Sequence, residues 1–165
     1  MSRIELTIEQ IKQLPLTHQT VIPEDYLDAM EHVNVMWYVH LFGHAMGEVF
    51  RRVHMDWERL AEHQCGTFAL EGHVRYLSEV RAGQTVEIYS RVLGRSEKRI
   101  HVIHFMVNQE KKDLSATQEI VGAHVDLRSR RMAPMPPEST KAIDALLEEH
   151  RALSWEAPTC GVMRS

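Results

Sequence analysis

The chain has 165 residues and a mass of 19.1 kDa, and 44% of its residues are hydrophobic. This is typical of one globular domain, expected to span residues 1–165. The net charge of -4 argues against a nucleic-acid-binding protein, and no apolar run is long enough to predict a membrane span. The N-terminus lacks an apolar signal core, which predicts a cytoplasmic protein.

The first predicted elements are a short helix, a strand and a long helix. Residues 7–14 form the short helix, which begins with a capping box of Thr7 and Gln10. Residues 16–22 form the strand. The helix over residues 33–52 is apolar almost all round, which is typical of a buried central helix.

From residue 66 to residue 131 the hydrophobic pattern has period two, which predicts four consecutive antiparallel strands. An amphipathic helix over residues 139–153 and a tail over residues 154–165 follow. The predicted fold class is therefore α+β, with a five-stranded antiparallel sheet wrapped around the long helix and a core over about residues 16–137.

The loop before the long helix holds the side chains best suited to chemistry. Asp28 and His32 precede the helix, and Asn34 and Tyr38 fall in its first turns. Unpaired N–H groups at a helix start can bind a carbonyl oxygen that gains negative charge. A nearby carboxylate can attack that carbonyl or activate water. The alternative is that Asp28 only caps the helix and His32 only bonds a loop carbonyl.

The strands offer a second carboxylate. Glu71 shares a strand face with His73, and Glu119 shares a face with apolar residues. Either glutamate could orient His32 or a catalytic water, or face a cationic group. Alternatively, each lies at a strand end or pairs with an arginine.

The 11 histidines invite comparison with metal sites. His40 and His44 are four residues apart, but the segment lacks the glutamate of H-E-x-x-H. His101 and His104 point to opposite faces of a strand. We therefore predict no metal site and no cofactor. The helical stripe of His40, His44 and Glu48 is predicted to be a solvated or subunit-facing edge.

The segment D-A-M-E-H-V-N-V-M-W-Y at residues 28–38 resembles the D-x-x-G-H-x-N-N-x-x-Y signature of hotdog-fold acyl thioesterases of the 4-hydroxybenzoyl-CoA type. The segment V-R-Y-L-S-E-V-R-A-G-Q-T-V at residues 74–86 is also similar to that family, and the resemblance covers about residues 20–137. Two positions depart from the signature: its glycine is Glu31 here, and its second asparagine is Val35.

The resemblance implies a single hotdog domain that forms a homodimer or homotetramer, with active sites at the subunit interface. It places the family carboxylate at Asp28, the motif histidine at His32, the asparagine at Asn34 and the tyrosine at Tyr38. The implied activity is hydrolysis of an acyl-CoA thioester. Asp28 would act as nucleophile or general base, and His32 and Asn34 would orient the water or the carboxylate.

Stretches that include E-G-H at residues 71–73 resemble the subgroup of betainyl-CoA thioesterases, which implies a short quaternary-ammonium acyl group. Glu71 is the predicted second catalytic carboxylate, and Tyr38 and His73 are predicted to bind substrate. Arg128 and Arg130 could bind coenzyme A phosphates or form a solvated rim. A non-catalytic acyl-CoA-binding or sensing protein is the alternative function. Four aromatic residues could either present their faces to such a cation or pack in the core: Trp37, Tyr38, Trp57 and Tyr76.

Overall fold

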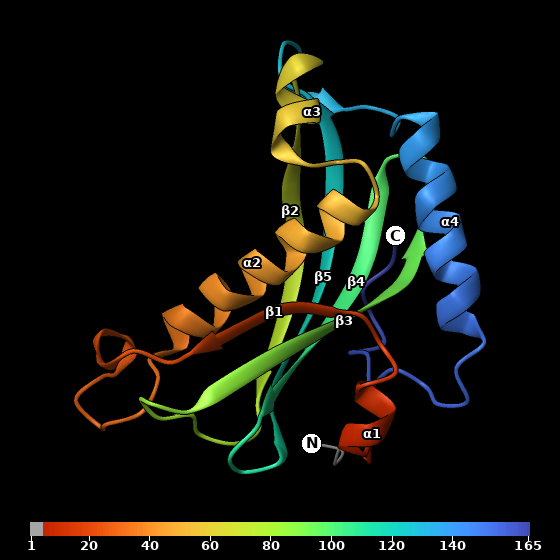
Figure 1. Ribbon diagram of the computed structural model, residues 1–165. Coiled ribbons are helices and arrows are strands. Elements are labelled where there is room, and N and C mark those ends of the chain that lie inside the picture. The colour runs from red at the N-terminus through yellow and green to blue at the C-terminus, as the bar shows by residue number, and fades with distance from the viewer. Residues whose placement is uncertain (1–4) are drawn as a thin grey trace. The chain divides into compact units, whose positions relative to one another are not determined.

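A computed structural model describes residues 5–165 of the chain (Figure 1). The helices are α1 (Ile8–Ile11), the 3-10 helix η1 (Glu24–Tyr26), α2 (Val35–Arg52), α3 (Trp57–Glu62) and α4 (Pro137–Arg151). The strands are β1 (Leu16–Val21), β2 (Cys65–Tyr76), β3 (Thr85–Arg95), β4 (Arg99–Asn108), β5 (Asp113–Asp126) and β6 (Arg131–Met132). No helix in the described part of the chain is long and apolar enough to cross a membrane.

The strands form one sheet in the order β1-β3-β4-β5-β2, and β6 pairs with β5. β1 runs antiparallel to β3, and the short connections from β3 to β4 and from β4 to β5 also require antiparallel pairing. The predicted α+β class is confirmed, with β6 as a sixth strand. The two-residue β6 and the six-residue α3 were not predicted, because such short elements leave no periodic pattern.

The chain divides into two compact units. The first comprises residues up to Met46, Val74–Ser90 and His104–Gln118. The second comprises Gly47–His73, Arg91–Ile103 and Glu119–Ser165. The single domain over residues 1–165 stays a prediction.

In the first unit, the beginning of α2 packs on alternate residues of the strands. Phe42 and Ala45 of α2 are fully buried, and they belong to one cluster with Val86 and Ile88 of β3. The two β3 residues share a face because side chains alternate along a strand. The rest of this core is supplied by Ile22, Val33, Tyr38, Leu41, Val80, Met106 and Ala116.

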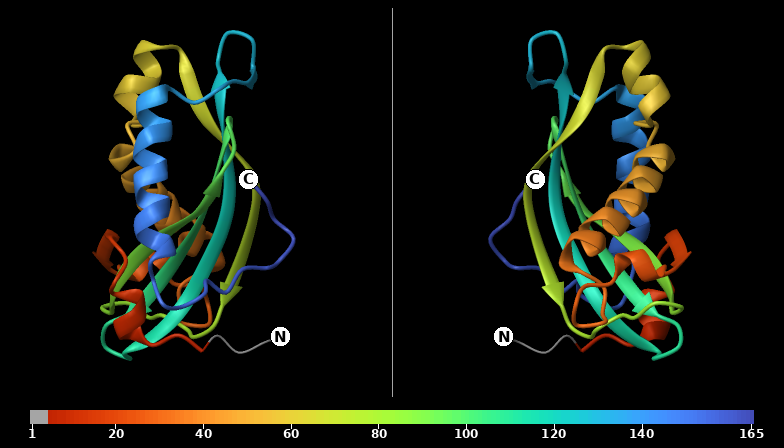
Figure 2. Two further views of the ribbon diagram at one scale, coloured as in Figure 1. Left: turned by 90° about the vertical axis from the view of Figure 1, so that its right-hand side faces the viewer. Right: turned by 90° about the vertical axis from the view of Figure 1, so that its left-hand side faces the viewer.

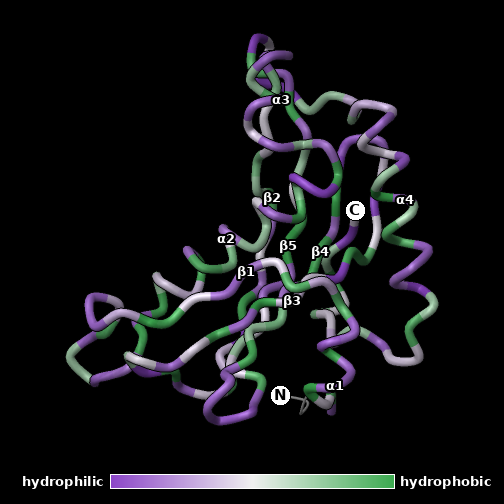
Figure 3. Tube along the Cα trace, viewed as in Figure 1, coloured by the Kyte–Doolittle hydropathy of each residue, from purple (hydrophilic) through white to green (hydrophobic). Residues whose placement is uncertain are grey.

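The predicted burial of the long helix holds for only part of α2, because three of its apolar residues are exposed. The exposed fractions of Val35, Met36 and Val39 are 58%, 61% and 48%. One face of the helix covers the core while these apolar residues point away from it, and the α2 trace mixes hydrophobic and hydrophilic residues (Figure 3). The apolar residues that surround this helix are therefore not all buried in the first unit.

In the second unit, α4 lies beside the end of β3 (Figures 1 and 2). The guanidinium of Arg91 donates to the carbonyl oxygens of His150 and Trp155, each at 2.8 Å. The guanidinium carbon of Arg91 lies 4.5 Å from the ring centroid of Trp155. The Val92 N–H donates to Nδ1 of His150 at 3.0 Å. These contacts fix the end of α4 and the segment after it against the strand.

Candidate active site

Asp28 closes a tight turn between η1 and α2. Its Oδ1 accepts the Met30 N–H at 2.8 Å, and its own N–H donates to the His32 carbonyl at 3.0 Å. Leu27 and Val33 pair across the base of this turn as an isolated antiparallel bridge. The alternative that Asp28 caps the long helix is therefore wrong, because its carboxylate caps the turn instead.

His32 faces the second oxygen of that carboxylate. Its Nδ1 lies 3.6 Å from Oδ2 of Asp28, and the two side chains are 31% and 22% exposed. The separation is longer than a hydrogen bond but within ion-pair range when the imidazole is protonated. The side chain thus faces Asp28 rather than a loop carbonyl.

Glu31 occupies the turn position where the resembling signature has glycine. Its φ of 61° lies in the left-handed region, which costs an L-residue energy and favours glycine. Glu31 therefore adopts the left-handed backbone conformation for which glycine, the signature residue at this position, is better suited.

Asn34 caps α2. Its Oδ1 accepts the Met36 N–H at 3.0 Å, and its carbonyl accepts the Trp37 N–H at 2.9 Å. Its own N–H donates to the Tyr26 carbonyl at 2.9 Å. Because an N-cap lies outside the helix, α2 begins at Val35, two residues later than predicted.

A cavity of about 280 Å³ opens beside the helix start. Tyr38 and Tyr76 meet edge-on across it, with ring centroids 5.2 Å apart at 82°. Burial raises the pKa of Tyr38, so its phenol stays neutral at physiological pH. Asp28 is outside the set of described residues that line this cavity: His32, Val33, Val35, Tyr38, Tyr76, Leu77, Ser78 and Glu79.

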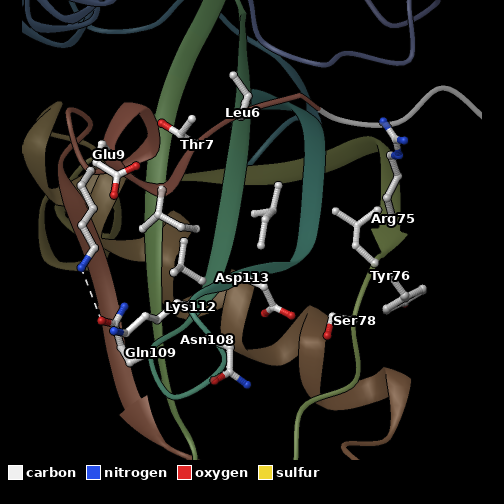
Figure 4. Close-up of a pocket in the computed structure, with 15 residues that line it drawn as sticks. Leu6, Thr7, Glu9, Arg75, Tyr76, Ser78, Asn108, Gln109, Lys112 and Asp113 are labelled. Atoms are coloured by element: carbon white, nitrogen blue, oxygen red, sulfur yellow. Dashed lines mark hydrogen bonds between the residues drawn. The ribbon is translucent and has the colours of Figure 1, made fainter.

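A larger cavity of about 1050 Å³ borders the same strand end (Figure 4). Glu9 and Gln109 lie on one side of it, and Arg75 and Tyr76 on the other. Residues 76–78 line both cavities, so this short segment is a shared wall. Residues 77 and 78 are not among the predicted site residues, although they lie in the segment 74–86 that carries the family resemblance.

Two other predicted site residues lie on β2 in the second unit. Glu71 and His73 are both exposed there. β2 is the last strand in the sheet order, so its outer edge has no neighbouring strand among residues 5–165. The structure therefore brings Asp28, His32, Asn34 and Tyr38 together in the first unit, and it places Glu71 and His73 on an exposed edge of the second.

The predicted phosphate-binding arginines also lie in the second unit. Arg128 donates from Nε to Oε1 of Gln64, and the guanidinium carbon of Arg130 lies 5.2 Å from the ring centroid of Phe68. Both side chains are exposed in the turn between β5 and β6. Their predicted contact with coenzyme A stays a prediction.

The predicted carboxylate on the apolar side of β5 is confirmed. Glu119 is 2% exposed, and its Oε1 lies 2.8 Å from Nε2 of His101. Its Oε2 accepts the Cys160 N–H at 2.6 Å. Glu119 therefore pairs with a histidine of β4 rather than an arginine, and it holds the C-terminal segment. Glu48, which belongs to the predicted polar stripe of α2, pairs with Arg51 at 2.7 Å.

His40 and His44 lie on the exposed face of α2, with their Nε2 atoms 3.1 Å apart. The ring of His18 stacks on that of His44, with centroids 5.1 Å apart. Across residues 5–165, no group of three or more His, Cys, Asp or Glu side chains is arranged to hold a metal ion.

Residues 21–143 match the thioesterase-like superfamily. The betainyl-CoA thioesterase of Pseudomonas aeruginosa is 29% identical over 143 residues, which cover 87% of this chain and 90% of that protein. An L-carnitine dehydrogenase/betainyl-CoA thioesterase of Agrobacterium fabrum is 29% identical over 130 residues, which cover 78% of this chain and 26% of that protein. The chain thus spans about a quarter of this longer relative.

Solved structures share the fold. A Staphylococcus aureus protein in complex with CoA has a TM-score of 0.80 at 18% identity, covering 87% of this chain and 90% of that one. A Pseudomonas putida protein provisionally assigned as a thioesterase has a TM-score of 0.76 at 25% identity, covering 92% and 96%. The 1,4-dihydroxy-2-naphthoyl-CoA thioesterase of Synechocystis has a TM-score of 0.71 at 14% identity, covering 79% and 96%. These likenesses confirm the predicted hotdog fold.

Proposed function

The chain belongs to the thioesterase-like superfamily, and on that premise we propose that it hydrolyses an acyl-CoA thioester to a free acid and coenzyme A. The relative named for betainyl-CoA hydrolysis supports this reaction class. The observation that carries the proposal is the Asp28–His32 pair, which lies in the turn before α2, next to a cavity lined by His32.

The proposed chemistry uses the start of α2. The first N–H groups of a helix lack partners within the helix, and Val35, the first helical residue, lines the cavity. Its N–H is the proposed donor to the thioester oxygen, which gains negative charge during attack. Asp28 acts as nucleophile or as general base for water, and His32 and Asn34 orient the water or the carboxylate. When Asp28 is the general base, it takes a proton from the attacking water, the C–S bond breaks, and the coenzyme A thiolate leaves and takes up a proton. When Asp28 is the nucleophile, the C–S bond breaks to leave a mixed anhydride on its carboxylate, and water then hydrolyses that anhydride to release the free acid.

The proposed acyl group is short and carries a quaternary ammonium. Such a cation is attracted to aromatic faces, and Tyr38 and Tyr76 supply two of them beside His32. Glu79 lines the same cavity, although its Oε1 also lies 3.1 Å from Arg81. Glu71 and His73, exposed on β2, keep their proposed roles as second carboxylate and substrate-binding residue.

The proposed assembly is a homodimer or homotetramer in the cytoplasm. β2 is a 12-residue edge strand, and an exposed edge of this length can pair with a second chain. Phe68 and Leu70 of this strand are 38% and 47% exposed, which adds apolar area to such a contact.

The direct test is thiol release from a panel that includes betainyl-CoA, short-chain acyl-CoAs and aromatic acyl-CoAs. Hydrolysis of at least one of them is expected, together with loss of most activity in folded Asp28→Ala. Binding without thiol release from any substrate would instead identify a non-catalytic acyl-CoA-binding or sensing protein. Unchanged turnover in Asp28→Ala would contradict the role of Asp28.

A further inference from the structure

We propose that Trp57 and Arg128 form the docking site for the adenosine 3′,5′-bisphosphate end of coenzyme A. The inference rests on the proposed function, because that function makes an acyl-CoA the substrate. It adds an adenine-stacking residue to the arginines already considered for the phosphates.

The site is a groove of about 300 Å³ in the second unit. Trp57 is the first residue of α3, and 74% of its surface is exposed. Arg128 comes from the turn after β5 and lines the same groove. Ala61 and Leu127 also line it, so part of its wall is apolar. A flat ligand can therefore lie on the indole while a charged part of it reaches the arginine.

The groove is held in place by contacts that leave its binding groups available. Asp56 caps α3 by accepting the Arg59 N–H at 3.3 Å, which fixes the helix start that carries Trp57. Arg128 uses Nε to donate to Gln64, so its two terminal nitrogens keep four N–H donors for a phosphate. The hydrogen bond to Gln64 thus orients Arg128 and leaves its terminal N–H groups for a ligand.

Positive charge is concentrated in the turn between β5 and β6. Arg128, Arg130 and Arg131 fall within four residues, and all three are exposed. Asp126 is the acidic group of this turn, and its Oδ1 accepts the N–H groups of Arg128 and Ser129, each at 2.8 Å. These hydrogen bonds lower the pKa of the Asp126 carboxyl, so it stays ionised and keeps the turn closed. The arginines therefore project from a fixed backbone.

The chemistry of the ligand matches this pairing. Adenine presents a large flat face that stacks on an exposed indole. The 3′-phosphate and the pyrophosphate of coenzyme A are anions for which a guanidinium fork is well suited. The Gln64 side-chain amide, which also lines the groove, can donate its N–H to a ring nitrogen of the base.

Calorimetric titration of the full chain with adenosine 3′,5′-bisphosphate alone tests the proposal. We expect Trp57→Ala to weaken binding about tenfold, the lower part of the range for one stacked base. Trp57→Phe keeps an aromatic face and should retain most of the affinity. Arg128→Gln should weaken binding about tenfold, whereas charge-matched Lys141→Gln on the exposed face of α4 should leave it unchanged.

Kinetics separate docking from chemistry. Trp57→Ala should raise KM for an acyl-CoA with little change in kcat, and it should leave hydrolysis of the matching N-acetylcysteamine thioester unchanged, because that substrate has no nucleotide. Absence of adenosine bisphosphate binding to the wild-type chain, or equal affinity in Trp57→Ala, overturns the proposal. Nucleotide binding without hydrolysis of any thioester would contradict the proposed function while leaving this docking site standing.

Discussion

Nδ1 of His32 lies 3.6 Å from Oδ2 of Asp28, while Oδ1 of the same carboxylate holds the Met30 N–H at 2.8 Å. One oxygen therefore maintains the turn, and the other faces the histidine. This division separates the structural role of Asp28 from its proposed chemical role, because a substitution can preserve the first and remove the second.

Asp28→Asn should abolish most activity without unfolding the turn. The amide oxygen can still accept the Met30 N–H, but the negative charge is lost. We expect kcat to fall roughly 100-fold or more, the usual size of a general-base contribution. The melting temperature should stay close to that of wild type. Asp25→Asn, an exposed change three residues earlier, is the matched control and should keep wild-type kcat. An active Asp28→Asn enzyme would refute the proposed role.

Much of the fold could be predicted because its patterns are local. Period-two alternation marked β2 to β5, and the capping box of Thr7 and Gln10 is confirmed at the start of α1. α1 nevertheless ends at Ile11 rather than residue 14, and the exposure of the apolar residues Val35, Met36 and Val39 on α2 was not predicted. Burial depends on which face meets the sheet, and composition alone does not determine that.

The candidate site also has a part that local sequence predicts and a part that it does not. Asp28, His32, Asn34 and Tyr38 are close in sequence, so a motif could bring them together on one loop and helix start. The contact between Tyr38 and Tyr76 depends on long-range packing, and no local pattern predicts it. Strand register likewise decides that Glu119 meets a histidine rather than an arginine.

Glu31→Gly should stabilise the protein by about 1 kcal/mol. Glu31 has a φ of 61°, and a left-handed conformation costs an ordinary residue about this much relative to glycine. Urea denaturation of the two proteins measures the difference. Glu31→Ala is the control, since it removes the side-chain charge without relieving the backbone and should give no gain. Equal stability of the wild-type and glycine proteins would show that the turn carries no strain at this position.

Stability should fall as the pH drops below about 6.5. Burial lowers the pKa of His104 from 6.5 to about 3, so the unfolded chain takes up a proton that the folded chain resists. The contribution is present above pH 6.5 and is lost progressively toward pH 3. Burial lowers the pKa of His18 and His150 as well, which acts in the same direction.

His104→Gln isolates the largest of these contributions. Between pH 7 and pH 4.5, wild type should lose roughly 2–3 kcal/mol more than the variant, from about 1.4 kcal/mol for each pKa unit. Urea titrations at the two pH values measure this loss. His73→Gln, which removes an exposed histidine instead of a buried one, is the matched control. A variant that loses as much stability as wild type would place the acid sensitivity elsewhere.

Tyr76→Leu should impair hydrolysis of a cationic acyl-CoA more than that of a neutral one. Tyr76 is 45% exposed and lines the cavity with Tyr38. Loss of one aromatic face should lower kcat/KM for betainyl-CoA about fivefold to tenfold, in the range of a partly desolvated cation–π contact. Tyr76→Phe keeps the face and should behave like wild type. An equal loss on a neutral acyl-CoA of matched size would argue against recognition of the cation.

Glu119→Ala should cost about 3 kcal/mol, because it breaks a buried pair and removes the acceptor for the Cys160 N–H. Chemical denaturation measures the loss, and amide exchange at Cys160 should become faster than at residues of β4. Glu148→Ala on the exposed face of α4 is the control and should change stability by less than about 0.5 kcal/mol. The two readouts separate two roles of Glu119. A large loss of stability with unchanged amide exchange at Cys160 would mean that Glu119 supports the sheet through His101 alone. Faster exchange at Cys160 with little loss of stability would mean that Glu119 only holds the C-terminal segment.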